Sequence, residues 1–225
     1  MVVGGYRYFY PNGKTDAPKD TKEPTKEVRV GDDNHESKDG KKSLVVYFSV
    51  PETTDPNKKM TTEEENSAIV VDGKVLGNTE YAALLIQENT NADIYRIEPK
   101  TPYTTDHSDL VNQAKEEQNK NLRSEIKNKI SNFDDYDIIY IGYPIWWSDM
   151  PQILYTFLEL YNFDGKTVIP FSTHGGSGLS GTVSTIQNKL KGAKVESNAF
   201  TMYRDNMEEA PEEIKSWLKE IGQID

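Results

Sequence analysis

The chain has 225 residues, of which 35% are hydrophobic, and its 37 acidic and 26 basic residues give a formal net charge of −11. A surface that binds nucleic acid or an anionic membrane needs clustered lysine and arginine, so this composition argues against both. It favours either a basic protein partner or plain solubility. The sequence has no cysteine, which excludes disulfides and cysteine-ligated metals, and its three histidines form no metal-binding pair, so we expect no metal site.

The first 42 residues contain little that could form a core. Residues 11–42 are rich in Lys, Asp, Glu, Thr, Pro and Gly, and ordering them would cost more entropy than burial could offset. We predict a polar, poorly ordered tail before one domain over residues 43–225. No run reaches the roughly 18–20 apolar residues of a membrane span, so we predict a cytoplasmic protein. The alternative is a membrane tether, in which the apolar residues 1–10 end a signal or anchor helix.

Apolar runs alternate with helical patterns after residue 42. Residues 43–49 form a continuous β-branched and aromatic run, typical of a strand covered on both faces. Further strands are predicted at residues 92–97, 137–142 and 166–172, and a short one within residues 194–200. Spacing and capping signals predict helices that begin at Asn78 or Thr79, at Ser108 (to about residue 130), at Pro151, at Thr182 and at Pro211. This alternation implies a parallel sheet, and ligands then bind beyond the carboxyl ends of its strands.

Two local features complicate this pattern. Residues 51–76 form an insertion after the first strand, with a hairpin predicted around Asp72-Gly73. Pro170 falls inside the fourth strand, where it is tolerable only if its missing N–H lies at a bulge or at the end of a ladder.

Three strand ends carry residues suited to a phosphorylated, planar cofactor. Ser49 ends the first strand, and Gly77-Asn78-Thr79 begins a helix, whose N-terminal N–H groups can hold a phosphate or simply be capped. The third strand leads into Pro144-Ile145-Trp146-Trp147, whose indoles can stack on a planar ring or plug the space beneath the next helix. The fourth leads into Thr173-His174-Gly175-Gly176-Ser177-Gly178, whose glycines permit close backbone approach.

Together these loops resemble the flavodoxin-like family, in the branch with a Pro-Ile-Trp-Trp loop and a Ser-Thr-x-Gly-Gly-x-Gly loop. The resemblance covers residues from about 43 to 222. It implies an α/β fold of three layers, in which a five-stranded parallel sheet of order 2-1-3-4-5 has helices on both faces. It also implies FMN as the cofactor.

The resemblance assigns roles residue by residue. The FMN phosphate would be held by Ser49, Gly77, Asn78 and Thr79. The isoalloxazine would be flanked by Pro144, Ile145, Trp146 and Trp147. Its other side and the ribityl chain would contact Thr173, His174, Gly175, Gly176 and Gly178.

The phosphate loop departs from the family pattern, which runs without interruption as Ser-x-Ser/Thr-Gly-Asn-Thr. Here Val50-Pro51 is followed by the insertion, and Pro51 offers neither a hydroxyl nor an N–H. We take Thr53 or Thr54 as the candidate replacement for the third position.

The resemblance implies an FMN-binding electron-transfer protein, in which the flavin performs the redox chemistry and no side chain is catalytic. The sequence shows no nicotinamide motif, which favours a carrier that serves redox partner proteins. The alternative is an FMN-dependent NAD(P)H:quinone-type oxidoreductase with a pocket for a quinone or a nicotinamide donor. A second alternative is a non-catalytic binding protein that retains the fold. The sequence leaves the oligomeric state open.

Overall fold

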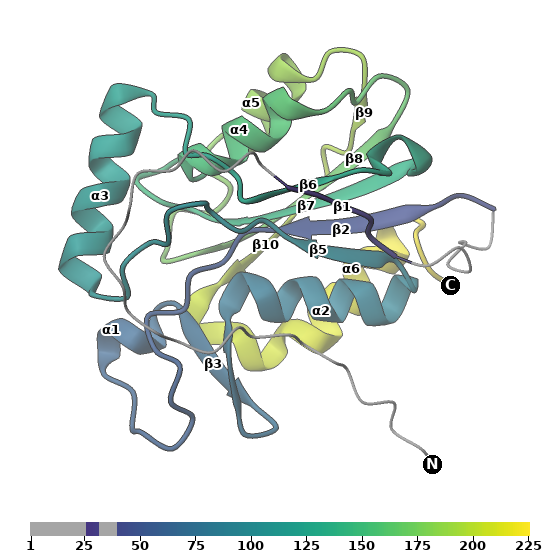
Figure 1. Ribbon diagram of the computed structural model, residues 1–225. Coiled ribbons are helices and arrows are strands. Elements are labelled where there is room, and N and C mark those ends of the chain that lie inside the picture. The colour runs from purple at the N-terminus through teal and green to yellow at the C-terminus, as the bar shows by residue number, and fades with distance from the viewer. Residues whose placement is uncertain (1–25, 32–39) are drawn as a thin grey trace.

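A parallel sheet forms the centre of the computed structural model, which describes residues 26–31 and 40–225 (Figure 1). From one edge to the other, its main strands are β5 (Asp93–Arg96), β2 (Ser43–Tyr47), β7 (Ile138–Pro144), β8 (Thr167–His174) and β10 (Phe200–Tyr203). Every pairing along this path is parallel. Counted along the chain, the order is 2-1-3-4-5, as the resemblance implies.

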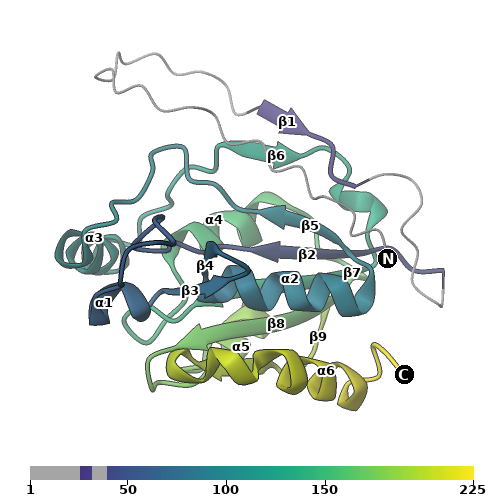
Figure 2. The ribbon, with the colours of Figure 1, turned by 90° about the horizontal axis from the view of Figure 1, so that it is seen from below.

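Helices cover both faces of the sheet. On one face lie α2 (Asn78–Thr90) and α6 (Ala210–Glu220), and on the other lie α4 (Gln152–Leu160) and α5 (Thr182–Lys189) (Figures 1 and 2). The fifth long helix, α3 (His107–Lys120), stands beyond the end of β2 and packs against α4. The predicted three-layer α/β fold is therefore confirmed.

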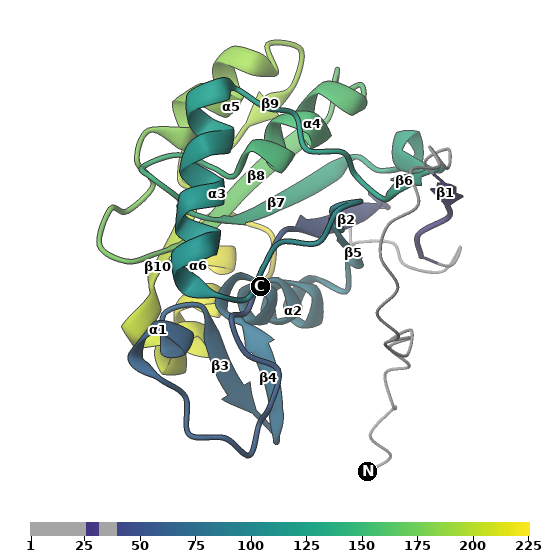
Figure 3. The same cartoon turned by 60° about the vertical axis from the view of Figure 1, so that its left-hand side comes forward.

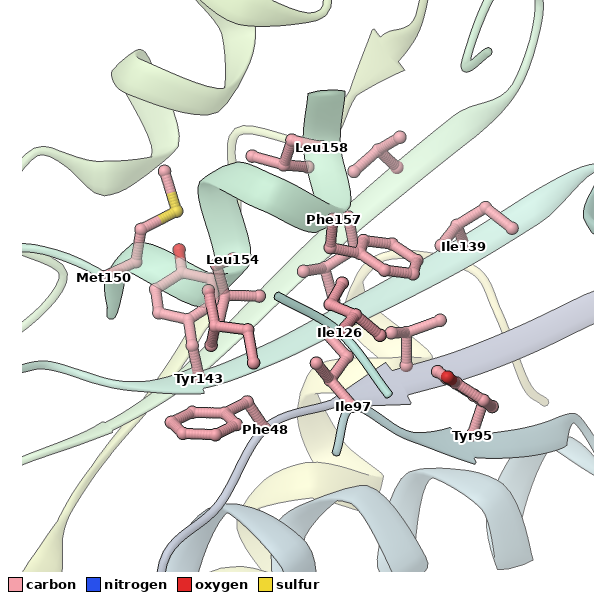
Figure 4. Close-up of a cluster of buried hydrophobic side chains, with 14 of the residues drawn as sticks. Phe48, Tyr95, Ile97, Ile126, Ile139, Tyr143, Met150, Leu154, Phe157 and Leu158 are labelled. Atoms are coloured by element: carbon pink, nitrogen blue, oxygen red, sulfur yellow. The ribbon is translucent and has the colours of Figure 1, made fainter. Parts of the chain in front are cut away.

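The continuous apolar runs are explained by this double cover. Along β2, Leu44 and Val46 face the core layer that contains α4, whereas Val45 and Tyr47 face the layer that contains α2 and α6. Successive side chains of a strand point to opposite faces, so a strand covered on both sides has no polar alternation. Figure 4 shows part of the first layer, where Phe48 lies near Tyr143 and Leu154 of α4.

Pro170 fits the centre of the sheet because the neighbour of β8 changes there. The start of β8 pairs with the short strand β9 (Lys194–Val195), and its last four residues, from Phe171, pair with β10. Pro170 falls between these two pairings, at the end of a ladder, as its missing N–H requires. The single strand predicted at residues 194–200 is thus two strands, and it is β10 that completes the main path.

The insertion folds back on the domain instead of extending away from it. It contains a one-turn helix, α1 (Thr62–Glu65), and the predicted hairpin of β3 (Ala68–Val71) and β4 (Lys74–Gly77). Asp72 and Gly73 both have positive φ, which a two-residue hairpin turn of this type requires. The hairpin leads directly into α2 and lies beside it (Figure 3).

One expectation from the sequence is corrected. The helix predicted from Ser108 to about residue 130 ends at Lys120, because Asn121 adopts the left-handed conformation with φ 48°. The chain then forms β6 (Asn128–Ile130), which pairs in parallel with β1 (Lys26–Val28). β1 lies inside the segment predicted to be poorly ordered.

The reason for the β1 pairing is not local. Asn132 exchanges two hydrogen bonds with the backbone of Val30, and the Tyr136 hydroxyl donates to the Val30 carbonyl. Partners a hundred residues away therefore order a segment with little apolar content of its own. Residues 1–25 and 32–39 of the predicted tail lie outside the described residues. The alternative of a membrane tether concerns these residues too. No helix in the described part of the chain is long and apolar enough to cross a membrane.

Candidate functional site

A cleft lies at the carboxyl ends of β2, β7 and β8, where the sequence analysis expects the site. The predicted site residues that line it are Ser49, Asn78, Thr79, Pro144, Ile145, Trp146, Trp147, Thr173, His174 and Gly175. Three predicted residues, Gly77, Gly176 and Gly178, are not among its lining residues. The structure thus brings the three strand-end loops together at one place.

The phosphate end of the cleft is built around Ser49 and the N-terminus of α2. A Cβ atom on Gly77, the N-cap residue, would lie 2.0 Å from the Ser49 hydroxyl oxygen, so only glycine leaves room for that side chain. Glu80 accepts a hydrogen bond from the Gly77 N–H, and Arg96 donates to the Ser49 carbonyl at 3.0 Å. Gly77 therefore shapes the site without lining it.

The insertion contributes a hydroxyl group to the phosphate end of the cleft, but from a different residue than the sequence suggests. Thr53 is buried and Thr54 is exposed, and neither lines the cleft. Ser67 does line it, and its carbonyl accepts from the Asn78 N–H at 3.0 Å. The Glu52 N–H donates to the Ser67 hydroxyl, also at 3.0 Å, so the two ends of the insertion meet beside α2.

Asn78 carries an unsatisfied acceptor into this region. Its side chain is almost fully buried, and Nδ2 donates to the Asn66 carbonyl, while Oδ1 has no hydrogen-bond partner among the described residues. A buried acceptor without a donor costs free energy, so a ligand hydroxyl group at this position would be favourable.

The two indoles after β7 differ in their surroundings. Trp146 packs edge-on against Phe48 and Tyr103, with centroid distances of 5.5 Å, and so plugs the core as well as lining the cleft. Trp147 is 48% exposed, and its Nε1 donates to the Val111 carbonyl of α3. Trp147 is therefore the more exposed of the two indoles, with Lys115 Nζ lying over its ring at 4.9 Å from the centroid.

The end of β8 supplies the opposite wall. The Thr173 and Thr79 hydroxyl oxygens lie 2.7 Å apart, which joins β8 to α2. His174 Nδ1 accepts the Gly176 N–H at 2.9 Å, and burial lowers the pKa of His174, so its ring is held neutral. Gly176 and Gly178 both have positive φ, which glycine adopts without strain, so they shape the backbone of this loop.

Arg204, which follows β10, is a lining residue that the sequence analysis did not identify. A Cβ atom on Gly175 would lie 2.8 Å from its Nη1, so Gly175 lets the guanidinium approach the loop after β8. Its Nε is buried and makes no hydrogen bond in the described part of the chain, with the Asp205 carboxylate 3.7 Å away. The cleft thus has a donor available at this end.

A carboxylate–imidazole pair, of which only the carboxylate is buried, also lines the cleft. His107 Nδ1 and Glu52 Oε2 are 2.8 Å apart, and the side chains are 35% and 7% exposed. Burial raises the pKa of Glu52, although the hydrogen bond from His107 opposes this. No local pattern marks the pair, because 55 residues separate its members and tertiary folding alone brings them together.

A model of the flavodoxin family matches residues 67–221. The chain belongs to the flavodoxin family. The match begins at Ser67, so β2, Ser49 and most of the insertion precede it. The part of this flavodoxin that departs most from the family pattern is thus also the part outside the family model.

Solved structures of flavoproteins resemble this flavodoxin over most of its length. A protein assigned as a flavoprotein from Bacteroides eggerthii is 29% identical, with a TM-score of 0.60, over 80% of this chain and 98% of that one. A second, from Bacteroides uniformis, is also 29% identical over the same shares, with a TM-score of 0.57. A flavoprotein from Lactobacillus acidophilus, in complex with FMN, is 20% identical over 79% of this chain and 98% of that one, with a TM-score of 0.53. No curated protein matches the chain.

An apolar wall from α3 completes the cleft of this flavodoxin. It consists of Leu110, Val111 and Ala114, in line with His107 at the start of the helix. The spacing of these four residues places them on one helix face, and this pattern could have identified the wall from the sequence.

Proposed function

We propose that this chain binds FMN in the cleft and acts as an electron-transfer protein. The observation that carries the proposal is the convergence of the loops after β2, β7 and β8 on one cleft. One loop offers hydroxyl and backbone groups at a helix N-terminus, the second an exposed indole, and the third a glycine-rich backbone. Such a set suits a ligand with a phosphate at one end and a planar ring at the other.

The residues present fit FMN. The unpaired Oδ1 of Asn78 would accept a hydrogen bond from a ribityl hydroxyl group. The hydroxyl groups of Ser49 and Thr79, with N–H groups at the start of α2, would hold the phosphate. The free donor on Arg204 would serve an oxygen of the ligand near the β8 loop.

The relatives support the same ligand. The Lactobacillus acidophilus protein is described in complex with FMN, and the two Bacteroides proteins are assigned as flavoproteins. FMN, once bound, supplies the capacity to accept and donate electrons. The chain's own task is then to orient the ring between Trp147 and the backbone around Gly175, and to shield it from water.

The partner is proposed to be a basic redox protein. An excess of eleven negative charges would steer a positively charged partner toward this molecule and would repel nucleic acid. A carrier needs no substrate pocket of its own, only access for its partner to the bound flavin.

A second candidate is an FMN-dependent NAD(P)H:quinone-type oxidoreductase. The observation in its favour is the apolar wall of Leu110, Val111 and Ala114, which could receive a small planar acceptor beside the ring. A carrier that only meets other proteins would not require this covered surface.

The test is a titration of the purified, flavin-free chain with FMN. We expect binding with quenched flavin fluorescence and a yellow complex, and the absence of binding at high FMN concentration would reject the proposal and favour a binding protein without flavin. NAD(P)H oxidation by the loaded protein, measured with and without a quinone, then separates the two candidates. Fast quinone-dependent oxidation would identify a reductase, whereas its absence would identify a carrier.

A further inference from the structure

We propose that His107, held by the buried carboxylate of Glu52, is a cationic contact for the phosphate of the bound flavin nucleotide. This inference rests on the proposed function. The third position of the phosphate loop, a hydroxyl residue in the family pattern, is interrupted here. α3 would supply a charged donor instead, and Glu52 of the insertion would hold it.

A chain of hydrogen bonds links His107 to the N-terminus of α2. The Asn78 N–H at the start of α2 donates to the Ser67 carbonyl, and the Ser67 hydroxyl accepts from the Glu52 N–H, each at 3.0 Å. Glu52 Oε2 in turn lies 2.8 Å from His107 Nδ1. His107 is thus linked to the helix N-terminus through Glu52 and Ser67, and all of these residues line one cleft.

The imidazole has one nitrogen available for a ligand. Nδ1 is engaged with Glu52, whereas Nε2 makes no hydrogen bond to any described residue. The side chain is 35% exposed and lines the cleft, so a ligand oxygen can approach it. With Nδ1 donating to the carboxylate, a protonated ring would present its Nε2–H as a donor to a ligand oxygen.

The distribution of charge along the cleft leaves this role to His107. The lining residues that can be cationic are His107, His174 and Arg204. His174 is held neutral by burial and by the Gly176 N–H, and Arg204 lies against Gly175 at the end of β8. Of these three residues, His107 is the one that hydrogen bonds through Glu52 and Ser67 connect to the N-terminus of α2. A charge-assisted hydrogen bond to a phosphate is stronger than a neutral one, so its loss should be measurable.

Comparison of FMN with riboflavin, which lacks the phosphate, isolates this contact. We expect His107→Gln to weaken FMN binding about tenfold, as the loss of one charged hydrogen bond implies, and to leave riboflavin binding unchanged. Lys120→Gln removes a positive charge from the exposed far end of the same helix and serves as the matched control, with neither affinity changed. Equal losses for both ligands, or no loss for either, in His107→Gln would overturn the proposal.

The wild-type chain provides a test that does not depend on the folding of a variant. The sequence has three histidines, so the imidazole signals can be followed by NMR while inorganic phosphate is added to the flavin-free protein. We expect the His107 signal to move, and phosphate to compete with FMN but not with riboflavin. An unmoved His107 signal at phosphate concentrations that displace FMN would contradict the assignment.

Glu52 is a positioning residue in this proposal, and its role has a separate readout. Glu52→Gln keeps the shape of the side chain but removes the charge, so the shift of the His107 NMR signal on addition of inorganic phosphate should shrink. Glu116→Gln, an exposed change on α3, should leave that shift as in the wild type. An unchanged shift in Glu52→Gln would remove Glu52 from the proposal. If neither FMN nor riboflavin binds the wild-type chain, the proposed function itself fails, whereas intact binding of both with unaltered selectivity in His107→Gln rejects this inference alone.

Discussion

The hydroxyl oxygens of Thr79 and Thr173 lie 2.7 Å apart, although 94 residues separate them in the chain. Thr79 lies in the first turn of α2 at the phosphate end of the cleft, and Thr173 stands near the end of β8 at the ring end. Both side chains are almost fully buried. This single bond therefore fixes the two ends of the site relative to each other.

We expect Thr79→Val and Thr173→Val each to lower the free energy of unfolding by about 1–2 kcal/mol, because each leaves the other hydroxyl buried and unpaired. The double variant should lose clearly less than the sum, since it leaves no orphaned group. Urea denaturation of the flavin-free protein measures all three. Additive losses would show that the bond does not couple the two elements.

Trp146 and Trp147 should respond differently to replacement by alanine. Trp146 is packed into the core with Phe48 and Tyr103, so its loss should cost about 2–4 kcal/mol of unfolding free energy. Trp147 is largely exposed, so its loss should cost little stability but weaken FMN binding about fivefold through lost stacking. Thermal denaturation measures the stability of both variants, and titration measures their affinity for FMN. Equal losses of stability and of affinity in the two variants would contradict this division of roles.

Asn78→Asp should reduce the preference for FMN over riboflavin. The two side chains have nearly the same shape, but aspartate brings a negative charge next to Thr79, whose hydroxyl group is proposed to hold the phosphate, and like charges repel. We expect FMN affinity to fall about tenfold or more, with a smaller change for riboflavin. The same substitution at Asn89, near the other end of α2, is the control and should leave the ratio of affinities intact.

Acidification should loosen the loop after β8 through His174. Burial places the folded-state pKa of His174 below its ordinary value of 6.5, so its contribution to stability is present above that pH and is lost as pH falls through the lowered value. Protonation of Nδ1 would also break its hydrogen bond with the Gly176 N–H. Melting temperatures of the wild type and His174→Asn between pH 7 and pH 5 measure this effect. The wild type should lose more, and parallel curves would exclude His174 as the cause.

The sequence by itself determined the sheet and the location of the site. The strands at 43–47, 138–144 and 167–174 are covered on both faces, so their apolar runs are visible without any knowledge of their neighbours. The loops that follow them necessarily meet at one edge of a parallel sheet, and the cleft lies there. Even the position of Pro170 at the end of a ladder could be predicted, because its lack of an N–H is a local property.

Only the tertiary structure decided how the site is completed. The Glu52–His107 pair, the return of Ser67 to the α2 N-terminus and the approach of Arg204 to Gly175 all join residues distant in the chain. The pairing of β1 with β6 has the same origin. Such contacts leave no periodic signal, because they depend on side chains that meet only when the chain has folded. The local pattern thus places the cleft, and long-range packing sets which polar groups face a ligand within it.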